Sequence, residues 1–202
     1  MKSKLILGTV QFGIDYGINN SVGKPNFKKV VEILNSAHLN GIRILDTAEA
    51  YGDSQVRIGR YHNQNSKKFK IITKFSPARQ DLPTNIIDRV YKNINTLGVS
   101  FLHGYMFHSF NDYKKYFPLM KNDLIRLREK SLINKIGVSL YSNKEIDEVL
   151  KDNFINLIQL PYNLLDNNNQ REEVLKKSKQ LGIEIHTRST FLQGLFFKKT
   201  DS

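Results

Sequence analysis

Four side chains that can hold or transfer a proton stand at or just beyond the ends of apolar stretches of this chain. Asp46 ends the apolar run 42–45, and Tyr51 follows five residues later beside a glycine. Lys74 ends a second such run and His108 a third. Short apolar runs are typical of buried parallel strands. Because parallel strands end at one edge of a sheet, we expect these four groups to share one proton-transfer site.

Together, the four groups predict machinery that protonates an oxyanion formed at a carbonyl. A phenol with a pKa near 10 is a poor proton donor at neutral pH. An ammonium within about 4 Å favours the phenolate by roughly 4 kcal/mol at an effective dielectric of 20, before desolvation. Lys74 should therefore lower the pKa of Tyr51 towards the range that general acid catalysis requires. Asp46 would keep Lys74 charged, and His108 would orient or polarise a substrate oxygen.

Each of these residues also has a purely structural interpretation. Asp46 could cap a loop, and Tyr51 could be a half-exposed turn aromatic. Lys74 could be solvated, and His108 could be a hydrogen-bonded strand-end histidine. These interpretations require four coincidences at one edge of a sheet, which favours the functional one.

Seven apolar runs, separated by helical patterns, predict the sheet that positions these groups. The predicted strands are residues 5–9, 42–46, 69–74, 101–108, 135–139, 156–160 and 183–186. Helices are predicted near residues 27–40, 54–59, 86–97, 124–127, 142–150 and 174–181, with a capping box formed by Ser142 and Glu145. Alternation of strand and helix predicts an α/β protein with a parallel sheet.

The spacing of the strands favours one kind of parallel sheet. Strand starts recur at about 30 residues, the rhythm of a (β/α)8 TIM-type barrel of about 250 residues. The spacing of the strands does not by itself exclude the alternative, a doubly wound open sheet. Ionisable groups at the ends of several strands favour the barrel, whose enzymes gather their chemistry there.

The chain has room for about seven parallel strands. After Gly194 the 202 residues leave no space for another helix and an eighth strand. We expect a single domain over residues 1–202: a barrel truncated at its C-terminus, or one whose closing segment comes from elsewhere. Open strand edges invite pairing, so we also expect a homo-oligomer that covers them.

Composition narrows the class of protein further. With 40% hydrophobic and 25% charged residues the chain is ordinary for a globular protein, and without cysteine it has no disulfide, thiolate nucleophile or cysteine metal site. We predict no metal site. The first apolar run is too short for a signal sequence or a membrane helix, which predicts a cytoplasmic protein without a membrane partner.

The net charge of +12 is compatible with anionic partners. The lysines are scattered over predicted outer helix faces, and no nucleic-acid-binding motif accompanies them. We therefore expect no nucleic-acid partner.

The motifs around the four groups resemble those of the aldo-keto reductase superfamily, NADPH-dependent oxidoreductases built on a (β/α)8 barrel. The matching segments are residues 8–13, 46–48, 51–52, 54, 58–59, 137–139, 159–163 and 188–195, together with Lys74 and His108. The resemblance implies hydride transfer between NADPH (or NADP+) and a small-molecule carbonyl substrate. It implies Tyr51 as the proton donor, tuned by Lys74 and Asp46, with His108 positioning the carbonyl.

The same resemblance implies a cofactor site at the mouth of the barrel. Ser139 and Gln159 would hydrogen-bond the nicotinamide carboxamide. The other implied cofactor-binding residues are Gly8, Thr9, Asp46, Arg188 and Ser189. Arg188 stands where many members carry a tyrosine that stacks on the nicotinamide, and a guanidinium can also stack on a ring. Leu140 stands where many members carry an asparagine.

Two further expectations follow from the resemblance. The family's segment around strand eight, which grips the adenosine 2′-phosphate, does not occur in these 202 residues. The alternative function is therefore a non-catalytic or cofactor-impaired barrel that acts as a binding or scaffold protein. Residues 161–166 and 188–194 resemble a bacterial branch associated with sugar or polysaccharide metabolism, which implies a sugar or keto-sugar substrate.

Overall fold

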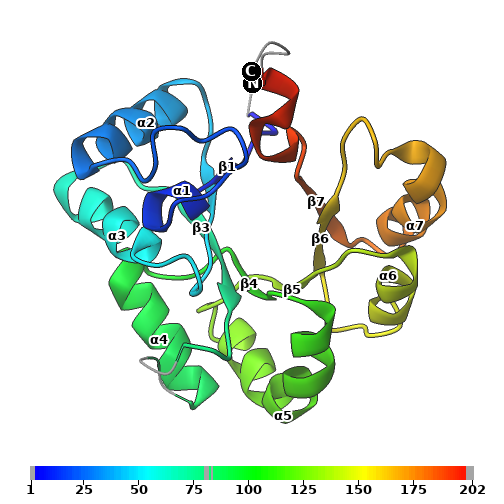
Figure 1. The fold of residues 1–202 in the computed structure, drawn as a ribbon. Coiled ribbons are helices and arrows are strands. Elements are labelled where there is room, and N and C mark those ends of the chain that lie inside the picture. The colour runs from blue at the N-terminus through cyan, green and yellow to red at the C-terminus, as the bar shows by residue number, and fades with distance from the viewer. Residues whose placement is uncertain (1–2, 80–81, 83, 199–202) are drawn as a thin grey trace.

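The computed structural model describes residues 3–79, 82 and 84–198, and in this part of the chain seven parallel strands form one curled sheet (Figure 1). The strands are β1 (Leu7–Gly8), β2 (Ile44–Asp46), β3 (Lys70–Phe75), β4 (Gly104–Phe107), β5 (Ile136–Ser139), β6 (Leu157–Pro161) and β7 (Glu184–Arg188). They lie in sequence order, and each neighbouring pair is parallel. A doubly wound sheet reverses its strand order partway across. The unreversed order therefore confirms the incomplete (β/α)8 barrel.

Six described helices cover the outer, convex face of the curled sheet (Figure 1): α2 (Phe27–Leu39), α3 (Ser54–Gln64), α4 (Ile86–Leu97), α5 (Phe110–Glu129), α6 (Asn143–Val149) and α7 (Asn168–Gln180). The short α1 (Val10–Gly13) follows β1 inside this ring, and the 3-10 helix η1 (Leu192–Phe197) follows β7 at the gap between the ends of the sheet. Side-chain caps fix several starts: Asn26 caps α2, Ser109 caps α5, and the predicted capping box of Ser142 and Glu145 opens α6. None of the described helices is long and apolar enough to cross a membrane.

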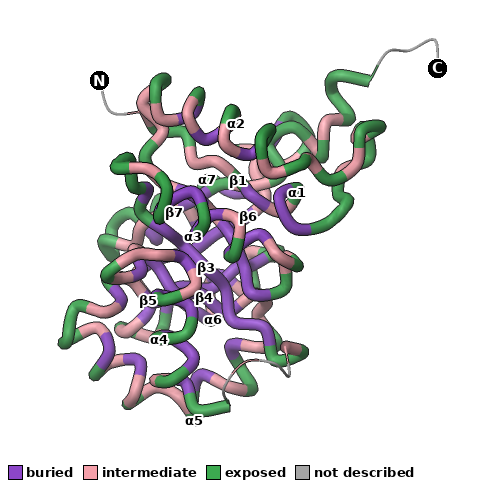
Figure 2. The backbone as a smooth tube through the Cα atoms, turned by 90° about the vertical axis from the view of Figure 1, so that its left-hand side faces the viewer, coloured by how far each residue is buried: buried purple, intermediate pink, exposed green. Residues whose placement is uncertain are grey.

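The main core lies between the sheet and these helices. Leu45, Ile71 and Val138 belong to it, packed in one cluster with helix residues such as Leu34 and Val90. Buried residues concentrate in the strands, and exposed ones on the outer helix faces and connections (Figure 2). One cluster joins side chains from Phe12 to Val174. A single domain over residues 1–202, which reaches beyond the described residues at both ends, stays a prediction that this continuous core supports.

A second, smaller cluster contains strand residues that alternate with those of the main core. Ile72, Met106 and Leu157 form it, and Ile6 and Ile44 pack against them. Because strand side chains alternate between faces, Asp46, Lys74 and Gln159 point to the same face as this cluster, two residues nearer the carboxyl ends. The pattern therefore places polar side chains at the mouth above an apolar layer.

The observed elements differ from the predicted ones mainly at their ends. Helix α3 continues to Gln64 instead of ending near Gly59. A Cβ on Gly59 would lie 1.8 Å from the backbone oxygen of Thr96, so this glycine permits close packing of α3 on α4. Helix α5 is longer than predicted and contains Pro118. Strand β1 is reduced to two residues and is followed by the unpredicted α1.

Candidate active site

Asp46 and Lys74 form an ion pair in the mouth of the barrel. Lys74 is only 1% exposed, and its Nζ donates to Asp46 Oδ1 and, at 3.1 Å, to the carbonyl of Thr47. The two residues lie on the neighbouring strands β2 and β3, whose parallel pairing brings them together. A buried ammonium requires a paired anion, which Asp46 supplies.

Tyr51 and His108 lie next to this pair. Tyr51 is on the loop between β2 and α3, where Gly52 turns the chain with a φ of 53°. The Nζ of Lys74 is 5.4 Å from the centroid of the Tyr51 ring. The imidazole of His108, directly after β4, meets that ring edge-on, with 5.7 Å between the ring centroids. The structure thus brings the four sequence-predicted groups together.

The electrostatics of Tyr51 differ from the sequence expectation. Burial raises the pKa of the Tyr51 phenol, Lys74 lowers it, and Asp46 raises it again. The net shift is upward, so the expected lowering of the Tyr51 pKa is wrong for the site as this chain builds it. Desolvation of the phenolate outweighs the attraction of the ammonium, which Asp46 already partly neutralises. The phenol therefore keeps its proton at neutral pH.

The imidazole of His108 is neutral at physiological pH. Burial, followed by the charge of Lys74, lowers its pKa to about 4, while Asp46 and Asp112 oppose the shift and Arg188 adds to it. A neutral imidazole carries one N–H donor and one acceptor nitrogen. It can donate to a carbonyl oxygen without carrying a charge into the site.

Gly8 and Thr9 lie at the end of β1, and the structure gives them different surroundings. Gly8 is exposed and paired in register with Asp46, and a Cβ there would meet no atom within 4 Å. Thr9 is fully buried, and its hydroxyl donates to the carbonyl of Asp46 at 2.9 Å. Ser54 donates to the carbonyl of Thr9 at 2.9 Å. Gly8 therefore borders open space, whereas the Thr9 side chain holds the Asp46 backbone.

Ser139 and Gln159 also lie at the mouth, at the ends of β5 and β6. Gln159 is 5% exposed and donates through Nε2 to Asp46 Oδ2 at 2.7 Å. Ser139 is 3% exposed, and its hydroxyl accepts from Nε of Arg188 at 3.3 Å. Both buried polar side chains therefore face the same space as the Asp46–Lys74 pair.

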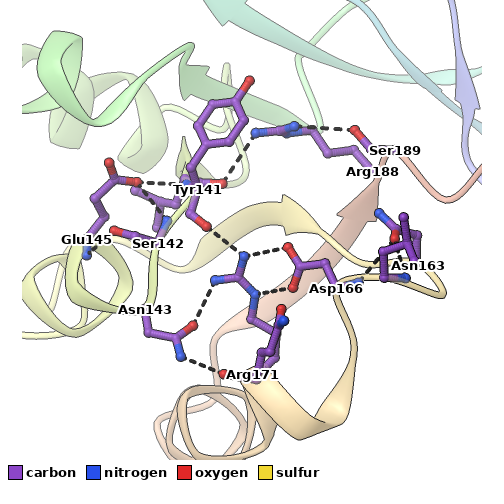
Figure 3. Close-up of polar contacts among 12 residues, drawn as sticks. Tyr141, Ser142, Asn143, Glu145, Asn163, Asp166, Arg171, Arg188 and Ser189 are labelled. Carbon is purple, nitrogen blue, oxygen red and sulfur yellow. Dashed lines mark hydrogen bonds and ion pairs between the residues drawn. The ribbon is translucent and has the colours of Figure 1, made fainter. Parts of the chain in front are cut away.

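Arg188 and Ser189 complete the described rim. The Arg188 guanidinium lies 4.1 Å from the centroid of the Tyr141 ring and donates to the carbonyl of Leu140 at 3.3 Å (Figure 3). Ser189 is exposed, with a φ of 58°, and its hydroxyl accepts from Arg188 at 3.4 Å.

A buried carboxylate, Glu49, is part of the site although the sequence analysis assigned it no role. It is 1% exposed and accepts from Arg89 at 2.6 Å, from Tyr105 at 2.8 Å and from Asn93 at 2.7 Å. The amide of Ser76 donates to it at 2.8 Å. The sequence signal for a role of Glu49 was its position two residues before Tyr51. Its bonding partners could not be identified from the sequence, because they lie far from it along the chain.

A second arginine holds the Tyr51 loop from outside. Arg79 donates to the carbonyl of Glu49 and, at 3.4 Å, to that of Gly52, on either side of Tyr51. The loop is thus held by its buried carboxylate and by its own backbone. Within the described residues, no three histidine, aspartate or glutamate side chains are grouped so that they could hold a metal ion.

The structure thus places an acid, a phenol, an amine and an imidazole at one mouth of a parallel sheet that curls into an incomplete barrel. The model of the Aldo/keto reductase family matches residues 4–202, and the chain belongs to this family. Membership supports an oxidoreductase function.

Individual relatives agree with the family match. The chain is 25% identical over 188 residues to the aldo-keto reductase str7 of Strobilurus tenacellus, covering 86% of this chain and 56% of that protein. It therefore spans little more than half the length of this curated relative.

Solved structures share the fold at low sequence identity. A putative aldo-keto reductase from Pseudomonas aeruginosa superposes with a TM-score of 0.73 at 22% identity, covering 91% of this chain and 72% of that one. A holo-form aldo-keto reductase from Bacillus halodurans gives 0.75 at 20% identity, covering 96% and 64%. An aldo-keto reductase from Klebsiella pneumoniae, solved in complex with NADPH, gives 0.70 at 17% identity, covering 96% and 68%.

Proposed function

We propose that this chain reduces a small-molecule carbonyl compound with NADPH, with Tyr51 as the general acid. The observation that carries the proposal is the buried ammonium of Lys74, which is paired with Asp46 and adjacent to the Tyr51 ring. Stability of the fold alone does not require a lysine to be buried beside a tyrosine that lies at the mouth of the barrel.

The proposed proton transfer follows from the charges around Tyr51. The phenol is protonated at neutral pH, so its proton is available when negative charge develops on the carbonyl oxygen. The phenolate left behind would be stabilised by the ammonium of Lys74, in a site where water does not screen the attraction. Asp46 holds that ammonium in place, and neutral His108 positions the carbonyl oxygen.

The residues of the mouth fit a nicotinamide cofactor. Gly8 leaves open space beside Asp46, and Ser139 and Gln159 offer buried hydrogen-bonding groups for a carboxamide. The proposed cofactor-binding residues are Gly8, Thr9, Asp46, Ser139, Gln159, Arg188 and Ser189, with Thr9 acting through the Asp46 backbone. The cofactor supplies the hydride, and the protein supplies position and electrostatics.

Tyr51→Phe tests the reductase proposal. Purified chain, NADPH and a panel of aldehydes and keto-sugars should show loss of reduced-nicotinamide absorbance. The substitution should lower kcat by at least about 100-fold, because it removes the proton donor. Tyr91→Phe is the matched control, since Tyr91 is an exposed residue of α4, and its rate should equal that of the wild type. Equal rates for the Tyr51 and Tyr91 variants would refute the role of Tyr51.

One observation favours the alternative, a barrel that binds or scaffolds without catalysis. Gln159 bonds to Asp46 and Arg188 bonds to Ser139, so the proposed cofactor-binding side chains satisfy one another. Cofactor binding would have to exchange these bonds. Calorimetric titration with NADPH separates the two functions: micromolar binding supports the reductase, and undetectable binding supports the alternative.

A further inference from the structure

Arg188 is a cation at the mouth that lacks a carboxylate partner among the described residues. Its three hydrogen bonds go to neutral oxygens of Ser139, Leu140 and Ser189, at 3.3, 3.3 and 3.4 Å. These distances are long for bonds donated by a guanidinium. Arg188 therefore forms no ion pair with a described carboxylate, although its charge contributes to lowering the pKa of Asp166.

Asp166, whose pKa Arg188 helps to lower, and Asp46, which lies at the same mouth, are both engaged with other residues. Asp166 receives two bonds of 2.6 Å from Arg171, which occupy both of its oxygens. Asp46 is paired with Lys74 and accepts from Gln159. Among the described residues the mouth therefore holds two cations: Lys74, which is paired with Asp46, and Arg188, which has no carboxylate within ion-pair distance.

The hydrogen-bonding capacity of Arg188 is also incompletely used. A guanidinium has five N–H donors in a planar fork. The three bonds to described residues use Nε and one hydrogen on each terminal nitrogen. One N–H on each terminal nitrogen is left over, which is the number that a bidentate carboxylate accepts.

The neighbouring loops hold the guanidinium in a defined place. Tyr141 covers one face of the Arg188 fork. The Tyr141 backbone is fixed by Glu145, which accepts from its amide at 2.7 Å, and by Arg171, which donates to its carbonyl at 2.7 Å. Arg171 also donates to Asn143 at 2.7 Å and to Asp166, which lies on the loop after β6 (Figure 3). It therefore joins the loops after β5 and β6. The exposed Tyr141 ring beneath Arg188 is therefore held through its backbone, by Glu145 and by the buried Arg171.

This cation acts on the same space as the reacting groups. Together with burial and Lys74, Arg188 lowers the pKa of His108. A group attached to a carbonyl bound at His108 therefore lies within the electrostatic reach of Arg188.

We propose that Arg188 anchors a carboxylate carried by the carbonyl substrate, so that the substrate class is a small oxo acid or a sugar acid. This inference rests on the proposed function. The carbonyl carbon of the oxo acid accepts a hydride from reduced nicotinamide, and its oxygen takes the proton of Tyr51. The oxo acid is reduced to a hydroxy acid, the nicotinamide is oxidised, and the carboxylate on Arg188 is unchanged. Stacking on the nicotinamide would use the face of the Arg188 guanidinium, and binding of the substrate carboxylate would use its edge. Arg188 can therefore serve both the cofactor and the substrate.

The test is a calorimetric titration that needs neither cofactor nor turnover. The probes are oxamate and succinamate, which are non-reducible carboxylates of two lengths bearing an amide carbonyl, and their neutral methyl esters. At least one carboxylate should bind while its ester does not. Arg188→Gln should weaken that binding by about 10- to 100-fold, because a charge-assisted pair is lost. Arg188→Lys, which keeps the charge without the fork, should recover only part of it.

Arg126→Gln is the matched control. Arg126 lies on α5 with an exposed side chain that is 3.4 Å from Asp123, so probe binding should be unchanged. Circular dichroism establishes that each variant is folded.

Three outcomes would overturn the inference. The carboxylates could bind no better than the esters, or folded Arg188→Gln and Arg188→Lys could both bind like the wild type. Alternatively, inorganic phosphate could displace the probe at equal concentration, which would make the site a general oxyanion site. Arg188-dependent binding without any NADPH oxidation would count against the reductase proposal alone and leave the carboxylate anchor standing.

Discussion

At the scale of single residues, burial decides the protonation of the groups in the mouth. Tyr51 and His108 are both desolvated, which favours the neutral form of each. Lys74 shifts the pKa of both groups downward. For Tyr51 this opposes burial, and for His108 it adds to it. A neutral phenol beside a neutral imidazole is the resulting resting state.

His108 should make the fold sensitive to acid. The pKa of His108 is 6.5 in a model peptide and about 4 in the folded chain. As the pH falls, this side chain is therefore protonated in the unfolded chain before it is protonated in the folded one. Its contribution to stability is fully present above pH 6.5 and is lost as the pH falls towards 4. The loss amounts to about 3 kcal/mol. His62 and His103, whose pKa values are also lowered mainly by burial, act in the same direction.

The measurement is urea unfolding of the wild type and His108→Gln between pH 7 and pH 4. The variant should lose less stability over this range than the wild type does. Parallel pH profiles for the two proteins would contradict the lowered pKa of His108.

At the scale of elements, the buried Glu49 joins four parts of the fold. Its carboxylate, on the loop after β2, bonds to the end of β3, to α4 through Arg89 and Asn93, and to β4 through Tyr105. Because Glu49 is two residues from Tyr51, these bonds fix the position of the phenol relative to the sheet.

Glu49→Gln should destabilise the fold strongly. The substitution removes the negative charge of the buried Glu49–Arg89 pair, and breaking a buried pair from one side costs about 3–5 kcal/mol. Chemical denaturation measures the effect. Glu32→Gln is the matched control, because Glu32 is half-exposed and pairs with Lys29 on the surface of α2. It should change stability by less than about 0.5 kcal/mol. Similar losses in both variants would show that the Glu49 network is not a fixed anchor.

The sequence predicted the strands that carry the site but not this network. Runs such as 42–45 identify strands because apolar side chains must be buried, and the order of the strands then brings Asp46 beside Lys74. The partners of Glu49 come from separate elements, and pairing over such distances has no local signal. The direction of the Tyr51 pKa shift was also out of reach, because it depends on how far the folded chain excludes water.

At the scale of the whole molecule, the curled sheet has two unpaired edges within the described residues. β1 pairs with β2 alone, and β7 pairs with β6 alone. The loop before α2 meets η1 through a 3.4 Å bond from Asn19 to Gln193, which bridges the ends of the sheet at the mouth only. No other described strand pairs with either edge.

The 202-residue polypeptide should therefore associate with itself. Unpaired strand edges favour pairing with another chain. We expect size-exclusion chromatography with light scattering to give a dimer or a larger species. A stable monomer at all concentrations tested would contradict this expectation.

The near-complete burial of Lys74 has a chemical consequence. Acylating reagents modify only amines that they can reach, and the Nζ of Lys74 is enclosed inside the barrel, where it pairs with Asp46. A reagent that labels the surface lysines will therefore spare this one. The labelling of Lys74 then reports how often the barrel opens.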